Sequence, residues 1–150
     1  MIITGQIVDA INKILSEKYP VITVYLNSCP KDFSRPSFCV KTVKAIERPA
    51  NRNTVKIRAR FSVTYFTKVD ESGNVNAENL VEIQAGIMSV FRKGFINVGD
   101  RQLMVMAKNR GIDVDSACVY LRFDYFDDRI GEMGNAPLME EVNFELNEEE

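Results

Sequence analysis

The sequence predicts an α+β fold in which two amphipathic helices pack on one face of a mostly antiparallel sheet. Two apolar stripes with helical spacing, at residues 3–15 and 80–91, are separated by runs that have the two-residue period of strands. The expected order of elements is α-β-β-β-α-β-β-β. Helices separated by antiparallel strands pack most simply on one side of a single sheet, which gives a two-layer sandwich.

The first helix is predicted from about Thr4 to Lys18. Its apolar residues recur at spacings of three and four, namely Ile3, Ile7, Ile11, Ile14 and Leu15. Thr4 is expected to cap the first turn. Pro20 is expected to end the helix, because the residue before a proline disfavours helical angles.

Three extended segments follow the first helix. They are Val21–Leu26, Ser37–Glu47 after a turn-rich loop at Asn27–Pro36, and Thr54–Thr67. The last has the clearest alternation, with apolar residues at odd positions from Val55 to Tyr65 and polar residues at even positions. One face of this strand is therefore predicted to be core and the other solvent-exposed, as in a sheet covered on one side.

The second helix has consistent signals at both ends. Asn76 is expected to cap it and Gly94 to terminate it. Its predicted buried stripe is Leu80, Ile83, Ile87, Val90 and Phe91. Three strands are expected after it, at Phe95–Val98, Gln102–Lys108 and Ala117–Phe126, with a hairpin turn at Gly99-Asp100.

The sequence divides into a single α+β domain at 1–128 and an acidic C-terminal extension at 129–150. The extension ends in a segment, 138–146, that carries Val142, Phe144 and Leu146 among glutamates. Clustered like charges resist packing, so a disordered tail is one interpretation. The large apolar residues favour another, an arm at 138–146 that docks on its own sheet or on a neighbouring subunit.

Charge is distributed unevenly along the chain, although the net charge is only −2. Residues 31–68 hold ten basic and two acidic side chains, a balance of +8, whereas residues 124–150 hold ten acidic and one basic, a balance of −9. Such asymmetry concerns association with partners and says little about fold.

Composition argues against an enzyme and predicts no catalytic, cofactor-binding or metal-binding residues. The chain has no histidine, which removes the commonest general base at neutral pH and the commonest zinc ligand. Its three cysteines, at 29, 39 and 118, form no C-x-x-C pair and are expected to be buried free thiols. No apolar run reaches the length of a membrane span and no signal pattern opens the chain, so we expect maturation in the cytosol.

Two groups of charged residues have alternative interpretations. Asp113 and Asp115, or Asp124 with Asp127 and Asp128, are expected to be solvated turn or rim residues, and catalysis by them is the least favoured alternative. Lys56, Arg58 and Arg60 share one strand face. That face is interpreted first as a solvated surface, second as an interface with acidic side chains of another subunit, and third as a nucleic-acid contact.

The order of elements over residues 1–126 resembles a known family. The resemblance includes the opening helix that ends in Tyr19-Pro20, the segment Asp32-Phe-Ser-Arg-Pro-Ser-Phe-Cys-Val40, and the strand Phe61-Ser-Val-Thr-Tyr-Phe66. The second helix and the closing strand Tyr120-Leu-Arg-Phe-Asp-Tyr125 follow in the same order. In these features the chain is similar to the phage tail terminator, or tail completion, proteins of siphophages and myophages that infect Gram-positive bacteria.

The resemblance implies a structural virion protein. Members of this family form a ring, commonly of six subunits, on the head-proximal end of the tail tube. The ring stops tube polymerisation and offers a surface for joining the head. The implied partners are other copies of the chain, the tail tube protein and a head-completion or connector protein, with no membrane and no specific nucleic acid. The implied location is the virion tail, assembled in the host cytoplasm.

A ring gives the charge asymmetry a role, because each subunit must present two different patches that complement each other. The candidate subunit interface is therefore formed by Lys56, Arg58, Arg60, Glu140, Glu141, Val142, Phe144 and Leu146. Two alternatives stay open, a different head–tail connector or assembly protein and a small nucleic-acid-binding module. Residues 129–150 extend beyond the shorter chains that the resemblance implies.

Overall fold

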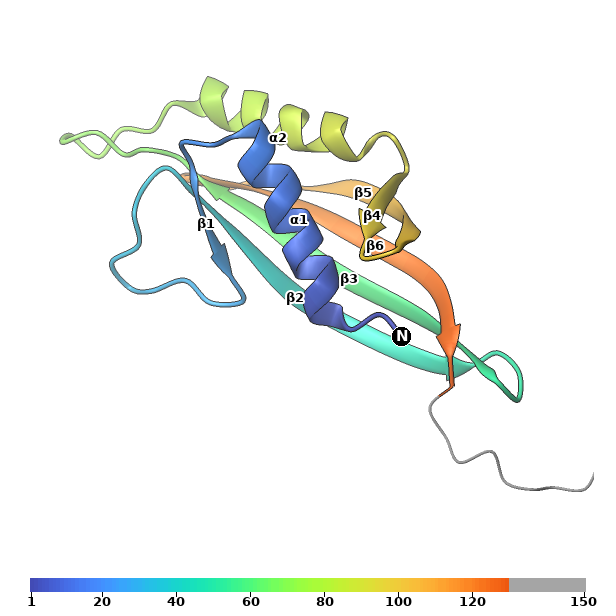
Figure 1. Cartoon of the computed structure of the whole chain (residues 1–150). Coiled ribbons are helices and arrows are strands. Elements are labelled where there is room, and N and C mark those ends of the chain that lie inside the picture. Colours follow the sequence, from blue (N-terminus) through green and yellow to red (C-terminus); the bar gives the residue numbers. More distant parts are fainter. Residues whose placement is uncertain (130–150) are drawn as a thin grey trace, which may run out of the picture.

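A computed structural model of the chain describes residues 1–129, which form two helices and one six-stranded sheet (Figure 1). The described elements are α1 (Thr4–Lys18), β1 (Thr23–Leu26), β2 (Ser37–Pro49), β3 (Thr54–Phe66), α2 (Ala77–Phe91), β4 (Phe95–Val98), β5 (Arg101–Ile112) and β6 (Ser116–Asp128). Their order confirms the predicted α-β-β-β-α-β-β-β arrangement and the α+β class.

The strand with the clearest alternation in the sequence, β3, lies inside the sheet. The strand order is β1-β2-β3-β6-β5-β4, so β3 pairs with β2 on one side and with β6 on the other. Both of these pairings are antiparallel, as are those of β6 with β5 and of β5 with β4. β1 pairs with β2 in parallel. The long pairings of β3 place its two neighbours in fixed register over 13-residue strands.

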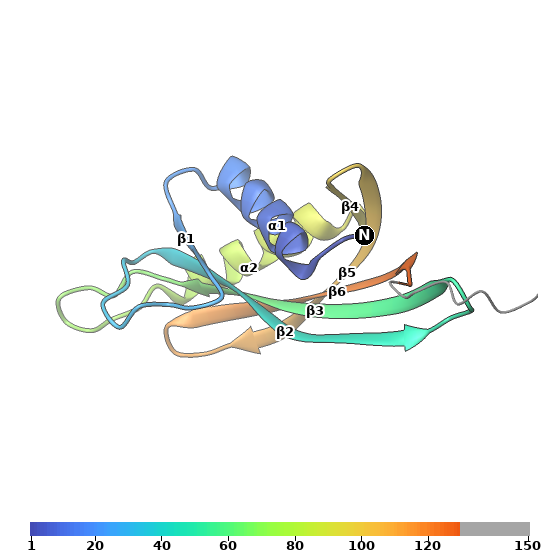
Figure 2. The ribbon, with the colours of Figure 1, turned by 60° about the horizontal axis from the view of Figure 1, so that its bottom comes forward.

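Both helices lie on one side of the sheet, as Figure 2 shows when the sheet is viewed close to edge-on. The core fills the space between the layers, because the odd positions of β3 and the apolar faces of α1 and α2 are buried together. Its largest fully buried side chains include Phe38, Phe61, Phe91 and Phe123. Within residues 1–129 nothing covers the opposite face of the sheet, which confirms the predicted one-sided layering.

The start of α1 differs from the prediction. Ile3 precedes the helix and is 60% exposed, so it does not belong to the buried stripe. Thr4 does not cap the first turn; instead the Ile3 N–H donates to Gln6 Oε1 at 3.0 Å. The buried residues of the helix are Ile7, Val8, Ile11 and Leu15. The stripe therefore begins one turn later than its first isoleucine suggested.

The predicted cap of α2 is confirmed, because the Asn79 N–H donates to Asn76 Oδ1 at 3.2 Å. Leu80, Ile87 and Phe91 are buried as expected, whereas Ile83 and Val90 are only half-buried. Gln84 is buried although it is polar. Its side-chain amide donates to the carbonyl oxygens of Gly111 and Cys118, which satisfies it inside the core.

A bulge explains the weak alternation that the sequence has in β2. The pairing of β2 with β3 shifts between Thr42 and Lys44, which inserts one residue and changes which positions face the core. Lys44, Ile46 and Arg48 therefore lie opposite Arg60, Arg58 and Lys56, on the face away from the helices.

Three further predictions concern the cysteines, a membrane span and the division of the chain at residue 128. The cysteines are free, but Cys39 is buried while Cys29 and Cys118 are half-buried. Neither helix of the described residues is long and apolar enough to span a membrane. The division at residue 128 stays a prediction, because the arm at 138–146 lies outside the described residues.

Candidate functional site

The face of the sheet that the helices leave open is strongly basic. Cross-strand partners in an antiparallel sheet point to the same side, so the register defines the members of this face. One row is Lys44, Arg60, Arg122 and Met106, and the next rows add Arg58 with Asp124 and Lys56 with Phe126. We call the following eight residues the basic face: Lys41, Lys44, Arg48, Lys56, Arg58, Arg60, Lys108 and Arg122.

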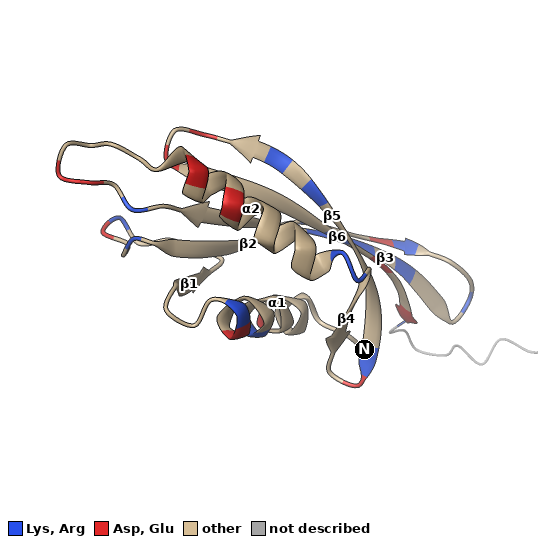
Figure 3. Ribbon diagram, turned by 90° about the horizontal axis from the view of Figure 1, so that it is seen from above, with Lys and Arg blue, Asp and Glu red and all other residues tan. Residues whose placement is uncertain are grey.

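The basic face brings together the three sequence-predicted residues Lys56, Arg58 and Arg60. All three are exposed on β3. The other predicted interface residues, Glu140, Glu141, Val142, Phe144 and Leu146, lie outside the described residues. Five further members join the face from other strands and were not among the predicted residues, namely Lys41, Lys44, Arg48, Lys108 and Arg122. Figure 3 shows Lys and Arg along several strands and acidic residues on α2.

The positive charge of the face is only partly neutralised. Asp124 is paired with Arg58 at 2.7 Å and with Arg122 at 3.1 Å. Burial alone would raise the pKa of Asp124, but the hydrogen bond from Arg58 and the charges of Arg122 and Lys56 lower it on balance. Asp128 lies at one end of the same strand. Eight basic residues against these two carboxylates leave a net charge of +6.

Apolar side chains are interspersed with the charges on the basic face. Met106 is 45% exposed and Phe126 is 53% exposed, and Ile46 lies between Lys44 and Arg48. Lys56 Nζ lies 5.7 Å from the centre of the Phe126 ring. Exposed apolar groups surrounded by polar residues are typical of a protein-binding surface.

The carboxylates considered for catalysis do not converge. Asp113 and Asp115 lie at the turn between β5 and β6, and Asp115 is paired with Arg35 at 2.9 Å. Asp124 lies eight residues further along β6 than Ser116, about 26 Å away at the rise of a strand. No cluster of three or more potential metal ligands of the His, Cys, Asp or Glu types occurs among residues 1–129.

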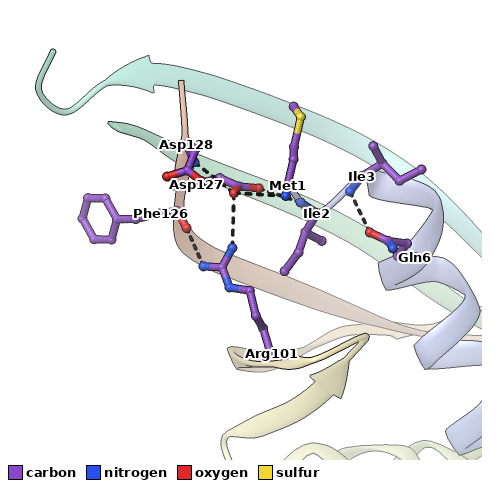
Figure 4. Close-up of polar contacts among 8 residues, drawn as sticks. All are labelled: Met1, Ile2, Ile3, Gln6, Arg101, Phe126, Asp127 and Asp128. Carbon is purple, nitrogen blue, oxygen red and sulfur yellow. Dashed lines mark hydrogen bonds and ion pairs between the residues drawn. The ribbon is translucent and has the colours of Figure 1, made fainter. Parts of the chain in front are cut away.

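Asp127 is a buried carboxylate and not the rim residue that the sequence predicts. Figure 4 shows that Ile2, Arg101 and Asp128 surround it. The Ile2 N–H donates to it at 2.6 Å, the Asp128 N–H at 2.9 Å and the Arg101 guanidinium at 3.3 Å. Burial alone would raise the pKa of Asp127, but these hydrogen bonds, the terminal ammonium and the charge of Arg101 lower it on balance.

This cluster fixes the end of β6 beside the basic face. Arg101 also donates to the Phe126 carbonyl oxygen at 2.6 Å, and the Arg129 N–H donates to the Asn53 carbonyl oxygen at 2.8 Å. The β2–β3 turn and the end of β6 are therefore held together. The chain leaves the described domain at the end of the sheet where Arg48, Lys56 and Phe126 lie.

The segment at 32–40 that carried part of the family resemblance has a packing role. Phe38 and Val40 are fully buried. The Phe33 ring lies 4.7 Å from that of Phe66, and the Arg35 guanidinium lies 4.8 Å from the centre of the Phe33 ring. The motif thus joins the loop before β2 to the end of β3.

Comparison with known proteins assigns the family. No curated protein matches the chain. The family model described as phage tail terminator protein matches residues 6–134, a span that includes β1 to β6, α2 and nearly all of α1. Because that match covers most of the 150 residues, the chain belongs to the phage tail terminator family, as the resemblance indicated.

Proposed function

We propose that this protein caps the head-proximal end of a phage or phage-like tail tube as a ring, stops tube polymerisation and provides the surface that joins the head. The observation that carries the proposal is the family match over residues 6–134. Membership supports a structural role in the virion tail, and a non-enzymatic one. The hexameric state, the tube protein, the connector protein and assembly in the host cytoplasm belong to the proposal.

The proposed contact between subunits joins two different patches, as a closed ring requires. One patch is the basic face. The other is the acidic arm of the next subunit, which carries Glu140, Glu141 and Glu145 beside Val142, Phe144 and Leu146. Opposite charges favour fast and selective docking, and the apolar side chains of both patches add buried area.

A charge-reversal experiment tests this contact. In the variant Lys44→Glu with Arg60→Glu, two cross-strand neighbours of the basic face become acidic. We expect this variant to lose ring formation. Electron microscopy of purified tails and sedimentation measure that loss. A second set of changes, Glu140→Lys, Glu141→Lys and Glu145→Lys, should restore it because the attraction is reversed on both sides.

A matched control changes the same charge elsewhere. Lys13→Glu with Lys31→Glu alters α1 and the loop after β1 and leaves the basic face intact. This control should assemble as the unchanged chain does. Wild-type assembly should also weaken as salt rises to about 0.5 M, where the screening length falls to roughly 4 Å. If Lys44→Glu with Arg60→Glu assembles as the wild type does, and wild-type assembly does not change with salt concentration, the proposed contact is excluded.

The nucleic-acid alternative makes a different prediction from the same face. Binding to DNA would require an affinity that falls steeply with salt, in proportion to the number of phosphates contacted. Titration with single-stranded and double-stranded DNA at two salt concentrations distinguishes it from the assembly contact. We expect no binding at physiological salt beyond weak electrostatic association.

A further inference from the structure

The basic face and the chain beyond it carry opposite charges of similar size. Residues 1–129 contain all 19 basic residues and 14 of the 21 acidic ones, which leaves +5. Residues 130–150 contain seven glutamates and no lysine or arginine, which leaves −7. The basic face together with Asp124 and Asp128 has a net charge of +6, so this surface and residues 130–150 are close to complementary.

The described chain ends at one end of the basic face. β6 ends at Asp128. The hydrogen bond from the Arg129 N–H to the Asn53 carbonyl oxygen holds that end against the β2–β3 turn. Arg48 and Lys56 of the basic face lie at the same end of the sheet. The last described residue, Arg129, therefore lies at the end of the sheet that carries Arg48 and Lys56.

The length of the remaining chain is sufficient to cover that face. The 21 residues from 130 to 150 can span up to about 70 Å when extended. The 13-residue strand β3 is about 43 Å long. The apolar residues Val142, Phe144 and Leu146 are thus within reach of Ile46, Met106 and Phe126 on the same subunit.

We propose that in the free subunit the basic face is the docking surface for the chain's own segment 130–150, with its glutamates against the Lys and Arg side chains. A tethered segment has an effective concentration in the millimolar range, which exceeds that of a second subunit in dilute solution. On the helical side the acidic residues Asp9, Glu17, Glu78 and Glu82 are balanced by Lys13, Lys18, Arg92 and Lys93, so that side offers an acidic segment no comparable net attraction. The face is thereby covered before assembly.

This inference rests on the proposed function, because the same two surfaces are assigned there to the contact between neighbouring subunits. Assembly would exchange an intramolecular contact for the same contact with the next subunit, as in domain swapping. A free subunit would then present no uncovered basic face. Ring formation would be favoured where many copies gather, as at the end of a tail tube.

Photo-crosslinking of the full chain tests the inference. Phe144 is replaced by benzoyl-phenylalanine, and an equal mixture of isotope-labelled and unlabelled chains is irradiated at low salt and low concentration. We expect crosslinks from position 144 to peptides of β2, β3, β5 or β6 on the open face, within chains of the same isotope. Crosslinking should fall severalfold in 0.5 M salt and in Lys44→Glu with Arg60→Glu, but not in Lys13→Glu with Lys31→Glu.

Three results would overturn the inference. They are crosslinks to α1 or α2, crosslinks between differently labelled chains in the free protein, and no crosslink to the open face at low salt. A second measurement does not depend on the photoreactive group. A labelled peptide of residues 130–150 should bind at least tenfold more tightly to a full chain whose six glutamates from 140 to 150 are changed to glutamine than to the wild type.

Equal affinity of that peptide for both chains would mean that the wild-type segment does not occupy the face. These experiments use the isolated protein, so their failure would leave the role in ending tail tubes untouched. Conversely, failure of the tail-length experiment described below would leave the intramolecular docking unaffected.

Discussion

Asp127 shows how one buried charge can hold together segments that are far apart in the sequence. Its side chain is only 3% exposed, and its donors come from the start of the chain, from β5 and from its own neighbour. A buried carboxylate is stable only when such donors compensate for the lost hydration. Asp127 therefore contributes to stability only while it is ionised.

We predict that Asp127→Asn destabilises the fold by about 2 kcal/mol at neutral pH, because a charged acceptor of three hydrogen bonds is lost. The folded pKa of Asp127 is lowered, so its contribution is complete above the unfolded pKa of about 4 and is lost as pH falls through the folded pKa. The difference in Tm between the two proteins should therefore shrink in acid.

Thermal unfolding from pH 7 to pH 3 measures this difference. Because Asp124 is present in both proteins, its own titration cancels in the comparison. Asp128→Asn changes the exposed neighbouring carboxylate and should leave the unfolding free energy within about 0.5 kcal/mol of wild type. A Tm difference that stays constant with pH would show that the charge of Asp127 has no part in stability.

Sequence reasoning missed Asp127 because none of the evidence for it is local. Asp124, Asp127 and Asp128 look alike as acidic residues at the end of a strand. Asp127 differs from the other two because it lies on the core side of β6 and accepts a hydrogen bond from the Ile2 N–H, 125 residues away in the sequence. Ile3 was misjudged for a related reason, since the helical spacing continues through it although the helix begins at Thr4.

At the scale of elements, side chains at the C-terminal end of α1 contact α2 at Gly86, whose carbonyl oxygen accepts a hydrogen bond from Lys18 Nζ at 2.9 Å. A Cβ atom at this position would clash with Tyr19 Oη. Tyr19 lies at the C-terminal end of α1, where its N–H donates to the Leu15 carbonyl oxygen at 2.8 Å, and its ring lies 5.4 Å from that of Phe38. A Cβ atom at position 86 would therefore force the Tyr19 ring to shift, and the packing of that ring against Phe38 opposes such a shift.

We predict that Gly86→Ala lowers the unfolding free energy by about 1–3 kcal/mol, although alanine favours helix more than glycine does. Tyr19→Phe in the same chain should recover most of the loss, because it removes the clashing oxygen. Gly5→Ala is the matched control in α1, where a Cβ atom would have no neighbour within 4 Å, and it should cause no loss. Chemical denaturation measures all three, and a loss that Tyr19→Phe does not relieve would contradict the account.

The loop from Asn27 to Pro36 is held by Arg35. Its guanidinium donates to the Thr67 carbonyl oxygen at 3.2 Å and to Asp115 at 2.9 Å, and it lies 5.6 Å from the centre of the Phe66 ring. A planar, fork-shaped cation can make these contacts together, whereas a lysine ammonium cannot.

We therefore predict that Arg35→Lys costs about 1 kcal/mol, since the pair with Asp115 is partly exposed. Amide hydrogen exchange should accelerate in residues 27–36 and in Thr23–Leu26, and not in α2. Lys31→Ala, an exposed change in the same loop, should leave exchange as it is. Unchanged exchange in Arg35→Lys would mean that the ring contacts and backbone bonds suffice to hold the loop.

The elements themselves were largely predictable, and their pairing was not. The alternation of β3 and the capping signals of α2 are local features, and the structure confirms both. The bulge in β2 is set by its pairing with β3, so the sequence showed only a loose alternation there. Lys44, Arg48, Lys108 and Arg122 could not be assigned to one surface without the strand order β2-β3-β6-β5.

At the scale of the whole molecule, the two-layer fold separates its faces by role. One side of the sheet packs against α1 and α2 and is buried in the core, and the other side presents eight basic residues. Within the described residues this open face has no covering layer, which is the property expected of a subunit that is completed by its own arm or by a neighbour.

Tail length, measured by electron microscopy in particles produced with the gene for this protein deleted, tests whether the protein ends tube polymerisation. A protein that ends tube polymerisation should, when absent, leave overlong tubes of variable length without heads. Restoring the gene should restore a single tail length and head attachment. Tubes of normal length that are joined to heads in the deletion would contradict the account.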